Sequence, residues 1–358
     1  MAQVIEIPRV GAVERGSDRD RALGALLGLA VGDALGTTYE FARIDQPPYP
    51  ALATGPATEI GGGGPFDLAP GCVTDDTHMA VCLARSLVER GAHDVDDVAR
   101  RYLAWSTHAF DIGAQTLAAL ERIGAGEAPH DAARAVWIAS GRRAAGNGSL
   151  MRIAPIGVAL AGHAHYLYPP ERARLLSAAI DESLVTHADP SCVLACGMFA
   201  AAIGAALCNE GTVDDASPAA RRYLARHACD AAAEALHDRW RDDHAAIDAA
   251  ANALRLDLEA SASPDPLFEP SGWVRVALRL AFWHDAHAPS YRDAVVDVAS
   301  RGGDADTNAA IVGALLGARD GVTAIPPAWI DRVLGATQPG PPDWADAHHP
   351  RHLLALVR

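Results

Sequence analysis

The sequence is poor in aromatic residues and lacks a segment typical of secretion signals. Aromatic residues make up 6% of its 358 residues, whereas apolar residues make up 50%, and alanine-rich runs recur along most of the chain. This composition favours helices over strands. Residues 1–18 carry several charges and no apolar core, so we do not expect a secreted protein.

Positive charge is also scarce. The chain has 30 lysine and arginine residues against 45 aspartate and glutamate residues, which gives a formal net charge of −15 at pH 7. Because nucleic acids and anionic membranes are bound through basic surfaces, we expect neither as a partner. The longest strongly apolar run, 192–208, is shorter than the roughly 20 residues that a membrane span requires. These features favour a cytoplasmic protein, which we interpret as a monomer.

A Cys-x-x-Cys pair, which would indicate a zinc or redox site, is absent as well. Most of the six cysteines stand among apolar residues, as expected for buried free thiols in a reducing compartment. They are Cys72, Cys82, Cys192, Cys196, Cys208 and Cys229.

Apolar residues recur instead at the spacing of amphipathic helices, and clean two-residue alternation is nearly absent. The segments with helical spacing are 21–35, 79–89, 98–105, 116–123, 132–140, 172–183, 191–208, 219–254, 274–284 and 308–318. The breaks rich in proline and glycine between them are too short for linkers between domains. The sequence therefore predicts one all-α domain.

The two ends of the chain are expected to lie outside this domain, and one internal stretch is expected to vary within it. We interpret residues 1–18 as an N-terminal extension, 19–337 as the domain and 338–358 as a C-terminal tail. The stretch 209–271 is polar and rich in charge, which indicates a variable insertion or a lid.

The pentapeptide GALLG occurs twice, at 24–28 and at 313–317. Glycines four residues apart share one face of a helix and allow a second backbone to approach closely. The repeat therefore predicts that these two helices cross near the centre of the fold. A chance repeat in a chain rich in alanine, glycine and leucine is the alternative.

Two acidic segments stand where predicted helices begin. Each supplies two carboxylates and a hydroxyl: Thr74, Asp75 and Asp76 in the first, Asp304, Asp306 and Thr307 in the second. Helix capping explains a single such oxygen. Three oxygens at each site exceed this need, and close like charges repel unless a cation lies among them. If the two helix starts converge, their six hard oxygen ligands suit Mg²⁺ or Mn²⁺.

A calcium loop of the EF-hand type is the competing interpretation, because D-x-D-x-N begins at Asp304. The sixth position of such a loop would be Ala309, where a glycine is needed for the turn. The twelfth would be Leu315, where a bidentate glutamate is needed. The spacing therefore excludes this loop.

Several motifs occur in the order found in the ADP-ribosylglycohydrolases, the family typified by the dinitrogenase reductase-activating glycohydrolase. They are ALGALLGLAVGDALGTTYEF (22–41), GGGGPFDLAPGCVTDDTHMA (61–80), DIGAQTLAAL (111–120), GNGSLMRIAPIGV (146–158), SLVTHADP (183–190) and SRGGDADTNAAIVGALLGARDG (300–321). The chain resembles this family over roughly residues 20–335. The paired acidic motifs are specific together, whereas either alone is weak.

The resemblance implies a compact, orthogonal helical bundle with two Mg²⁺ ions, or Mn²⁺ as the alternative. Its expected metal ligands are Thr74, Asp75, Asp76, Asp304, Asp306 and Thr307. Glu40 matches an acidic residue on a loop over the metals and is expected to be catalytic together with Asp304. Asp33 matches an aspartate beside the metals and is expected to support the helices that carry the ligands.

The resemblance also implies residues that bind ADP-ribose. These are Gly113, which opens a turn before a helix, Asn147, Gly148 and Ser149 in a loop able to point N–H groups at a diphosphate, and His187 near the distal ribose. A plain capping turn is the alternative for the two loops. Arg152 is expected either to pair with phosphate or to fix the loop on a carboxylate.

The implied function is hydrolytic removal of ADP-ribose from a modified side chain, with arginine as the expected acceptor and serine or an acyl oxygen as alternatives. The substrate is an ADP-ribosylated protein or a small ADP-ribosyl compound. Ala305, Ala144 and Ala145 depart from the family pattern, and the latter two lie at the expected pocket wall. Two other classes remain open: an ADP-ribose-binding or toxin-binding immunity protein without turnover, and a metal-dependent phosphoesterase.

Overall fold

The computed structural model describes residues 3–47, 49–161, 169–207, 217–263 and 271–357. Within these ranges fifteen α-helices accompany one two-stranded hairpin, which confirms the all-α fold. The elements are β1 Val4–Ile7, β2 Gly11–Glu14, α1 Asp18–Gly36, η1 Thr37–Tyr39, α2 Asp75–Arg90, α3 Val95–Ser106, α4 Ala114–Gly124, α5 Pro129–Ala139, α6 Ala154–Ala161, α7 Pro169–Ser183, α8 Pro190–Leu207, α9 Pro218–Arg239, α10 His244–Ala260, α11 Val274–His287, α12 Tyr291–Ala299, α13 Ala305–Asp320, η2 Val322–Ala324, α14 Pro327–Gly335, α15 Pro342–Ala347 and η3 Pro350–Leu356.

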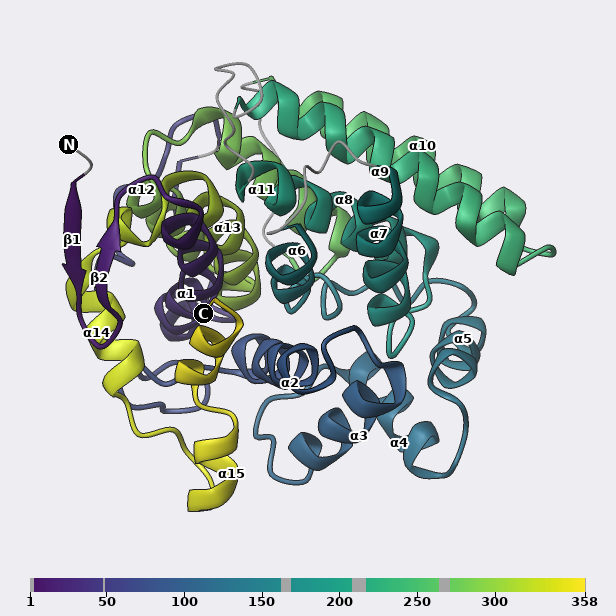
Figure 1. Ribbon diagram of the computed structural model, residues 1–358, viewed down its shortest axis with the longest axis horizontal. Helices are drawn as coiled ribbons and strands as arrows, with labels where there is room; N and C mark the ends of the chain where they lie inside the picture. The colour runs from purple at the N-terminus through teal and green to yellow at the C-terminus, as the bar shows by residue number, and fades with distance from the viewer. Residues whose placement is uncertain (1–2, 48, 162–168, 208–216, 264–270, 358) are drawn as a thin grey trace.

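Helices α1 and α13 form the central antiparallel pair, side by side in Figure 1. Small residues four apart face each other along the contact, in the pairs Gly24 with Gly317, Gly28 with Gly313, Gly32 with Ala309 and Gly36 with Ala305. A Cβ atom added to any of these four α1 glycines would lie only 2.1–2.4 Å from a carbonyl oxygen of α13. The structure therefore confirms that the GALLG helices cross, and it gives the reason for the repeat.

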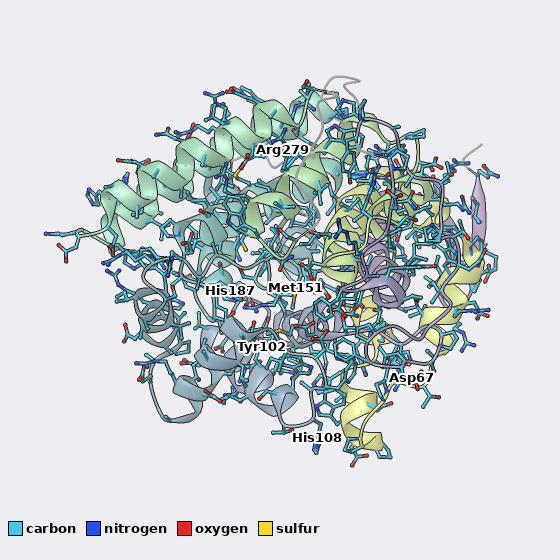
Figure 2. All side chains as sticks on the ribbon, turned by 180° about the vertical axis from the view of Figure 1, so that it is seen from behind. Asp67, Tyr102, His108, Met151, His187 and Arg279 are labelled. Carbon is cyan, nitrogen blue, oxygen red and sulfur yellow. The ribbon has the colours of Figure 1, made fainter. Side chains whose placement is uncertain are left out.

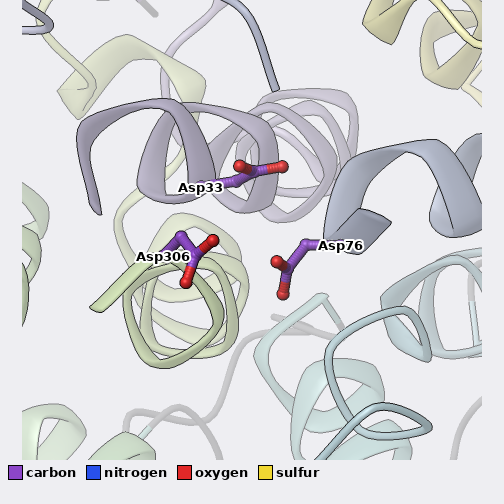
Figure 3. Close-up of side chains that lie close together, drawn as sticks. All are labelled: Asp33, Asp76 and Asp306. Atoms are coloured by element: carbon purple, nitrogen blue, oxygen red, sulfur yellow. The ribbon is translucent and has the colours of Figure 1, made fainter. Parts of the chain in front are cut away.

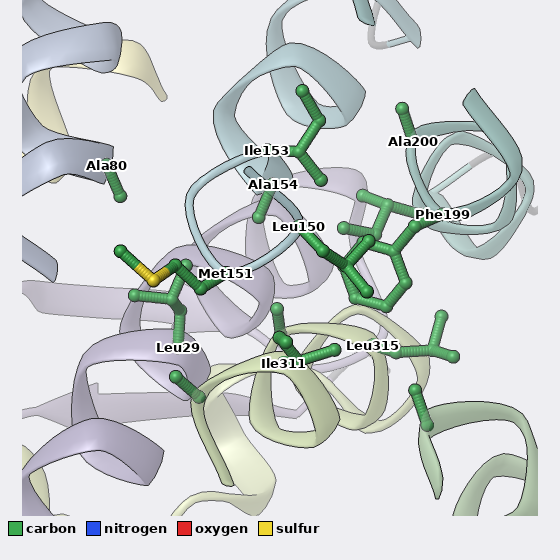
Figure 4. Packing of buried hydrophobic residues seen from close by; sticks show 14 of the residues in the cluster. Leu29, Ala80, Leu150, Met151, Ile153, Ala154, Phe199, Ala200, Ile311 and Leu315 are labelled. Atoms are coloured by element: carbon green, nitrogen blue, oxygen red, sulfur yellow. The ribbon is translucent and has the colours of Figure 1, made fainter. Parts of the chain in front are cut away.

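Helix α8 forms a second core element and contacts α6, α7, α9, α11 and α13. Figure 4 shows Phe199 of α8 packing with Leu315 of α13 and with Leu150. All three side chains are essentially fully buried. Helices α9 and α10 form a long pair along one edge of the molecule (Figure 1).

Judged by length and composition alone, two helices, α1 and α8, are long and apolar enough to cross a membrane. For α8 this differs from the expectation that the run 192–208 is too short. Their apolar windows are 83% and 94% buried inside the molecule. Both helices therefore pack as core helices of the fold.

The prediction of a single helix over 219–254 is wrong. Helix α9 ends at Arg239, and α10 begins at His244. The turn between them is held to α5, because Trp240 stacks on Trp137 and the Asp243 carboxylate forms an ion pair with Arg134. Tertiary contacts thus override a periodic pattern that continues through the turn.

Both chain ends pack against the helices rather than extending from them. The hairpin buries Ile7 and Val13, and α15 places Trp344 against His78 of α2. The domain boundaries, and the role of 209–271 as an insertion or a lid, stay predictions; residues 209–216 and 264–270 lie outside the described ranges. Five cysteines are buried and free, as predicted, and Cys208 lies outside the described residues.

Candidate functional site

Close packing of α1 on α13 places Asp33, near the end of α1, beside the start of α13. Asp33 is fully buried and serves as the cap of a third helix, α2. Its carboxylate accepts hydrogen bonds from the backbone N–H groups of Thr74 and Thr77, at 3.1 and 3.2 Å, and from both hydroxyls. Asp33 therefore joins the starts of α2 and α13 to the end of α1.

The two acidic segments meet at this junction. One carboxylate oxygen from each of Asp33, Asp76 and Asp306 lies within 4.8 Å of the others, and Figure 3 shows the three side chains pointing toward a common centre. The hydroxyls complete the group: Thr74 Oγ1 lies 3.1 Å from Asp76 Oδ2, and Thr307 Oγ1 lies 3.4 Å from the same oxygen. Residues more than 200 positions apart thus form one oxygen-rich site.

A second group of carboxylates adjoins the first and shares Asp306. Oxygens of Glu40, Asp111 and Asp306 lie within 4.8 Å of one another. The carboxyl groups of Asp75 and Asp111 lie within hydrogen-bond reach. Asp304 lies on the side of the loop 146–149, where its Oδ2 accepts a 2.6 Å hydrogen bond from Asn147 Nδ2.

The glycines in front of Asp304 fix the segment that carries Glu40. Phe41 donates its N–H to the Gly303 carbonyl at 2.6 Å, and Gly303 donates to the Ala42 carbonyl at 3.0 Å. Gly302 has φ +71°, and a Cβ atom there would lie 2.1 Å from the Ala42 oxygen. Only glycine permits this approach, which leaves Glu40 buried against the acidic cluster.

The negative charges of the site are not balanced by neighbouring positive side chains, which indicates a bound cation. In the part of the chain that the structure describes, no arginine or histidine forms an ion pair with Asp33, Glu40, Asp75, Asp76, Asp111, Asp304 or Asp306. Burial holds the pKa values of Asp75, Asp76 and Asp306 well above the ordinary value, and the negative charges of neighbouring carboxylates raise them further. Burial, with the charges of Asp111 and Asp304, raises the pKa of Glu40 to about 8.

Two buried oxygens of the site, Asp76 Oδ1 and Glu40 Oε2, have no hydrogen-bond partner among the described residues. A buried carboxylate oxygen without a donor or a cation is costly. Hard oxygen ligands of this kind suit Mg²⁺ or Mn²⁺, so these residues fit the metals that the sequence predicts.

The alternative of simple helix capping does not describe these segments. Thr74 and Asp304 are the residues that precede α2 and α13, yet neither side chain makes a capping hydrogen bond. Their oxygens point toward the acidic cluster and toward Asn147 instead.

The predicted ligand-binding loops lie next to the cluster. Gly113 is exposed and precedes α4, whose first turn receives no side-chain cap, so N–H groups there are available to an anion. Gly146 donates its N–H to Gln115 Oε1 at 3.2 Å, and Asn147 donates its N–H to the Gly272 carbonyl at 3.0 Å.

Three predicted residues lie deeper. Ser149 is fully buried, and its hydroxyl pairs with Ser183 and Cys196, so its side chain does not face the carboxylates. His187 lies behind Gly148, where an added Cβ atom would be 2.9 Å from the imidazole Nε2. Arg152 is fully buried and pairs with Glu182 at 2.8 Å, which excludes phosphate pairing and confirms that it fixes the loop on a carboxylate.

Sequence reasoning missed two polar residues of the site. Asp111 stands in a matched motif, but nothing in its spacing indicates that it reaches Glu40. Gln115, the second residue of α4, has a buried Nε2 without a partner among the described residues. Asp111 lies on the connection between α3 and α4 and Gln115 directly after it, and sequence patterns carry little information about the direction in which such side chains point.

Comparison with known proteins agrees with this arrangement. The family model described as ADP-ribosylglycohydrolase matches residues 14–355. The chain belongs to the ADP-ribosylglycohydrolase family. It is therefore a glycosidase-type hydrolase.

Two relatives that have been named align with most of this chain. The chain is 33% identical over 330 residues to the ADP-ribosylarginine hydrolase Tri1 of Pseudomonas putida, covering 88% of this chain and 74% of that protein. It is 29% identical over 323 residues to the ADP-ribosyl-[dinitrogen reductase] glycohydrolase of Rhodospirillum rubrum, covering 88% and 91%. A solved structure, an ADP-ribosylglycohydrolase-related protein complex, matches with a TM-score of 0.67 and 32% identity over 96% of this chain and 98% of that one.

Proposed function

We propose that this ADP-ribosylglycohydrolase removes ADP-ribose from modified arginine side chains and depends on two divalent ions, Mg²⁺ or Mn²⁺. The observation that carries the proposal is the junction of both acidic motifs around Asp306, which belongs to two adjoining groups of carboxylates at once. The substrate is an ADP-ribosylated protein or a small ADP-ribosyl compound.

The residues that would hold the ions are Thr74, Asp75, Asp76, Asp304, Asp306 and Thr307, with Asp33 close enough to one group to take part. When bound, a pair of divalent ions would neutralise this charge and would supply the Lewis-acid chemistry that orients the distal ribose and activates water. Asp33 holds the N-terminus of α2, and Asn147 holds Asp304. These contacts keep the oxygens oriented.

The reaction breaks the bond between the anomeric carbon of the distal ribose and the guanidinium nitrogen, and a water oxygen takes the nitrogen's place. The water loses a proton and the leaving nitrogen gains one, so a carboxylate must accept and return a proton. Glu40 is suited to this task, because it is buried beside Asp306 on a segment fixed to the Asp304 motif. Asp304, which accepts a hydrogen bond from Asn147, would stabilise charge on the side of the loop 146–149.

The arginine acceptor is supported by Asp111 as well as by the relatives. Its carboxylate is partly exposed and lies near Glu40 and Asp75, with no ion pair among the described residues. A guanidinium group carries donors in the geometry that a carboxylate binds in two-point fashion. A neutral serine linkage offers no such match.

We also propose that the enzyme is a cytoplasmic monomer, and the state of its cysteines agrees with the cytoplasmic location. Five cysteines are buried without a disulfide in the described residues, as suits a reducing compartment.

The test is product analysis with arginine-linked ADP-ribose, with and without Mg²⁺. We expect free ADP-ribose in the presence of Mg²⁺, loss of at least about a hundredfold in rate for Asp304→Ala, and serine- or acyl-linked substrates cleaved more slowly. Release of AMP would support a phosphoesterase instead. Tight ADP-ribose binding without product would support a binding protein, and undiminished cleavage by Asp304→Ala without added metal would contradict the mechanism.

A further inference from the structure

A chain of buried hydrogen bonds runs from Glu182 to His187 behind the loop 146–149. Glu182 is fully buried and accepts from Tyr102 Oη at 2.7 Å and from Arg152 Nε at 2.8 Å, and it lies 3.0 Å from His93 Nε2. The guanidinium also stacks on the Tyr102 ring, 4.6 Å from its centre. A charged pair is thus fixed in the interior (Tyr102 and His187 are labelled in Figure 2).

Arg152 distributes its other donors toward the loop and toward His187. One NH₂ group donates to the Gly148 carbonyl at 3.1 Å. The other donates to Thr186 Oγ1 at 2.9 Å and to the Glu182 carbonyl at 3.3 Å. Thr186 Oγ1 in turn lies 2.8 Å from His187 Nδ1. All of these side chains are at least nine-tenths buried.

The positions of the protons follow from what each group is able to donate. Arginine only donates, so Thr186 Oγ1 accepts from it. The hydroxyl hydrogen then needs an acceptor, and among the described residues His187 Nδ1 is the one within reach. If Nδ1 carried the hydrogen instead, the buried hydroxyl would receive two donors and leave its own hydrogen unpaired. The ring therefore accepts at Nδ1.

The remaining ring nitrogen is then the donor. Burial holds the pKa of His187 well below its usual value, so the ring is neutral and carries one hydrogen. Nε2 has no partner among the described residues, and it lies against Gly146 and Gly148. Nε2 is absent from the fully buried, unpaired atoms, so its N–H reaches open space beside the loop and is available to an acceptor on a ligand.

We propose that Glu182, Arg152 and Thr186 are positioning residues that hold His187 in its Nε2–H form, as a hydrogen-bond donor to an oxygen of ADP-ribose at the loop 146–149. This inference rests on the proposed function for the identity of the ligand. The form of the ring does not depend on it.

Nuclear magnetic resonance of protein labelled with ¹⁵N histidine reads the ring form directly. The chain has 15 histidines, and a His187→Gln variant identifies the His187 signals by their loss. We expect the wild type to show Nε2–H at neutral pH without any ligand. A His187 ring with the hydrogen on Nδ1 would overturn the proposal.

Variants of Thr186 test the link to ligand binding. Thr186→Val keeps the shape of the side chain and removes the hydroxyl, so we expect His187 to be held no longer in the Nε2–H form alone. We also expect the Kd for ADP-ribose to rise about tenfold, the worth of one hydrogen bond, and the Mn²⁺ affinity to stay unchanged. Thr186→Ser restores the hydroxyl and is expected to restore both readouts. The control is Ser261→Ala, which removes a buried hydroxyl at the end of α10 that donates to the Leu258 carbonyl and to no other described residue.

The results distinguish the positioning of His187 from the identity of its ligand. If Thr186→Val left both the ADP-ribose affinity and the His187 ring form unchanged, the proposed positioning of His187 through Thr186 would be overturned. Failure of the wild type to bind or release ADP-ribose would overturn the proposed function and the identity of the ligand, whereas the spectrum without ligand would still decide the ring form.

Discussion

Replacing Gly28 by alanine tests the contact on which the site is built. A methyl group there would lie 2.3 Å from the Gly313 carbonyl oxygen and 3.1 Å from Cε2 of Tyr291, so α1 and α13 would have to move apart. Overpacking of this kind costs about 1–3 kcal/mol. In an unconstrained helix the same change would gain up to about 1 kcal/mol. We therefore expect Gly28→Ala to lower stability, against the preference of the helix.

Gly197→Ala is the matched control. Gly197 is also a buried glycine inside a core helix, but an added Cβ atom would meet Cδ2 of Leu176 at 3.4 Å and Cβ of Ala232 at 3.6 Å, which are ordinary contact distances. We expect this variant to match or exceed the wild type. Thermal unfolding measures both, and each kcal/mol corresponds to a shift of about 2–4 °C or less in a chain of this size.

Gly28→Ala should also weaken the stabilisation that Mn²⁺ confers, since the two helices carry Asp33 and Asp306. A Gly28→Ala protein as stable as Gly197→Ala, with the same gain from Mn²⁺, would refute the view that backbone contact between α1 and α13 positions the site.

Two further substitutions give separate predictions. Burial by itself raises the pKa of Asp97, but hydrogen bonds from Arg101 and other neighbours lower it below the value in the unfolded chain. The Asp97 carboxylate therefore stabilises the fold fully above about pH 4, and this contribution is lost as the pH falls through the pKa of the folded state. Asp97→Asn should therefore cost about 1.5–3 kcal/mol at pH 7, with a deficit in unfolding experiments that shrinks below about pH 4; an equal deficit at pH 2 would count against this. Asp111→Asn should raise KM about tenfold for arginine-linked ADP-ribose and leave serine-linked substrate unaffected in steady-state kinetics, whereas equal losses on both would remove Asp111 from acceptor recognition.

The sequence predicts the parts of this fold that depend on local pattern. The GALLG repeat predicts the α1 and α13 contact, because small residues at helical spacing have few other uses in a core. The surplus of oxygens in the motifs around Asp76 and Asp306 likewise indicates more than capping. In both cases the requirement is written into consecutive residues.

Other features depend on what lies across the fold. The turn at Trp240–Asp243 exists because α5 supplies Trp137 and Arg134 to hold it. Asp33 stands near the end of an apolar helix pattern, and only the position of α2 shows that it caps another helix. The choice between two roles for Arg152 depends on Glu182, which lies 30 positions away in the chain.

Titration of metal-free protein with Mn²⁺ in a calorimeter tests the central claim most directly. The wild type should bind two ions, and Asp76→Asn and Asp306→Asn should each lose most of this binding, although the two residues lie more than 200 positions apart in the chain. Full Mn²⁺ binding by either variant would show that the two motifs do not share their ions, and the proposed mechanism would be contradicted.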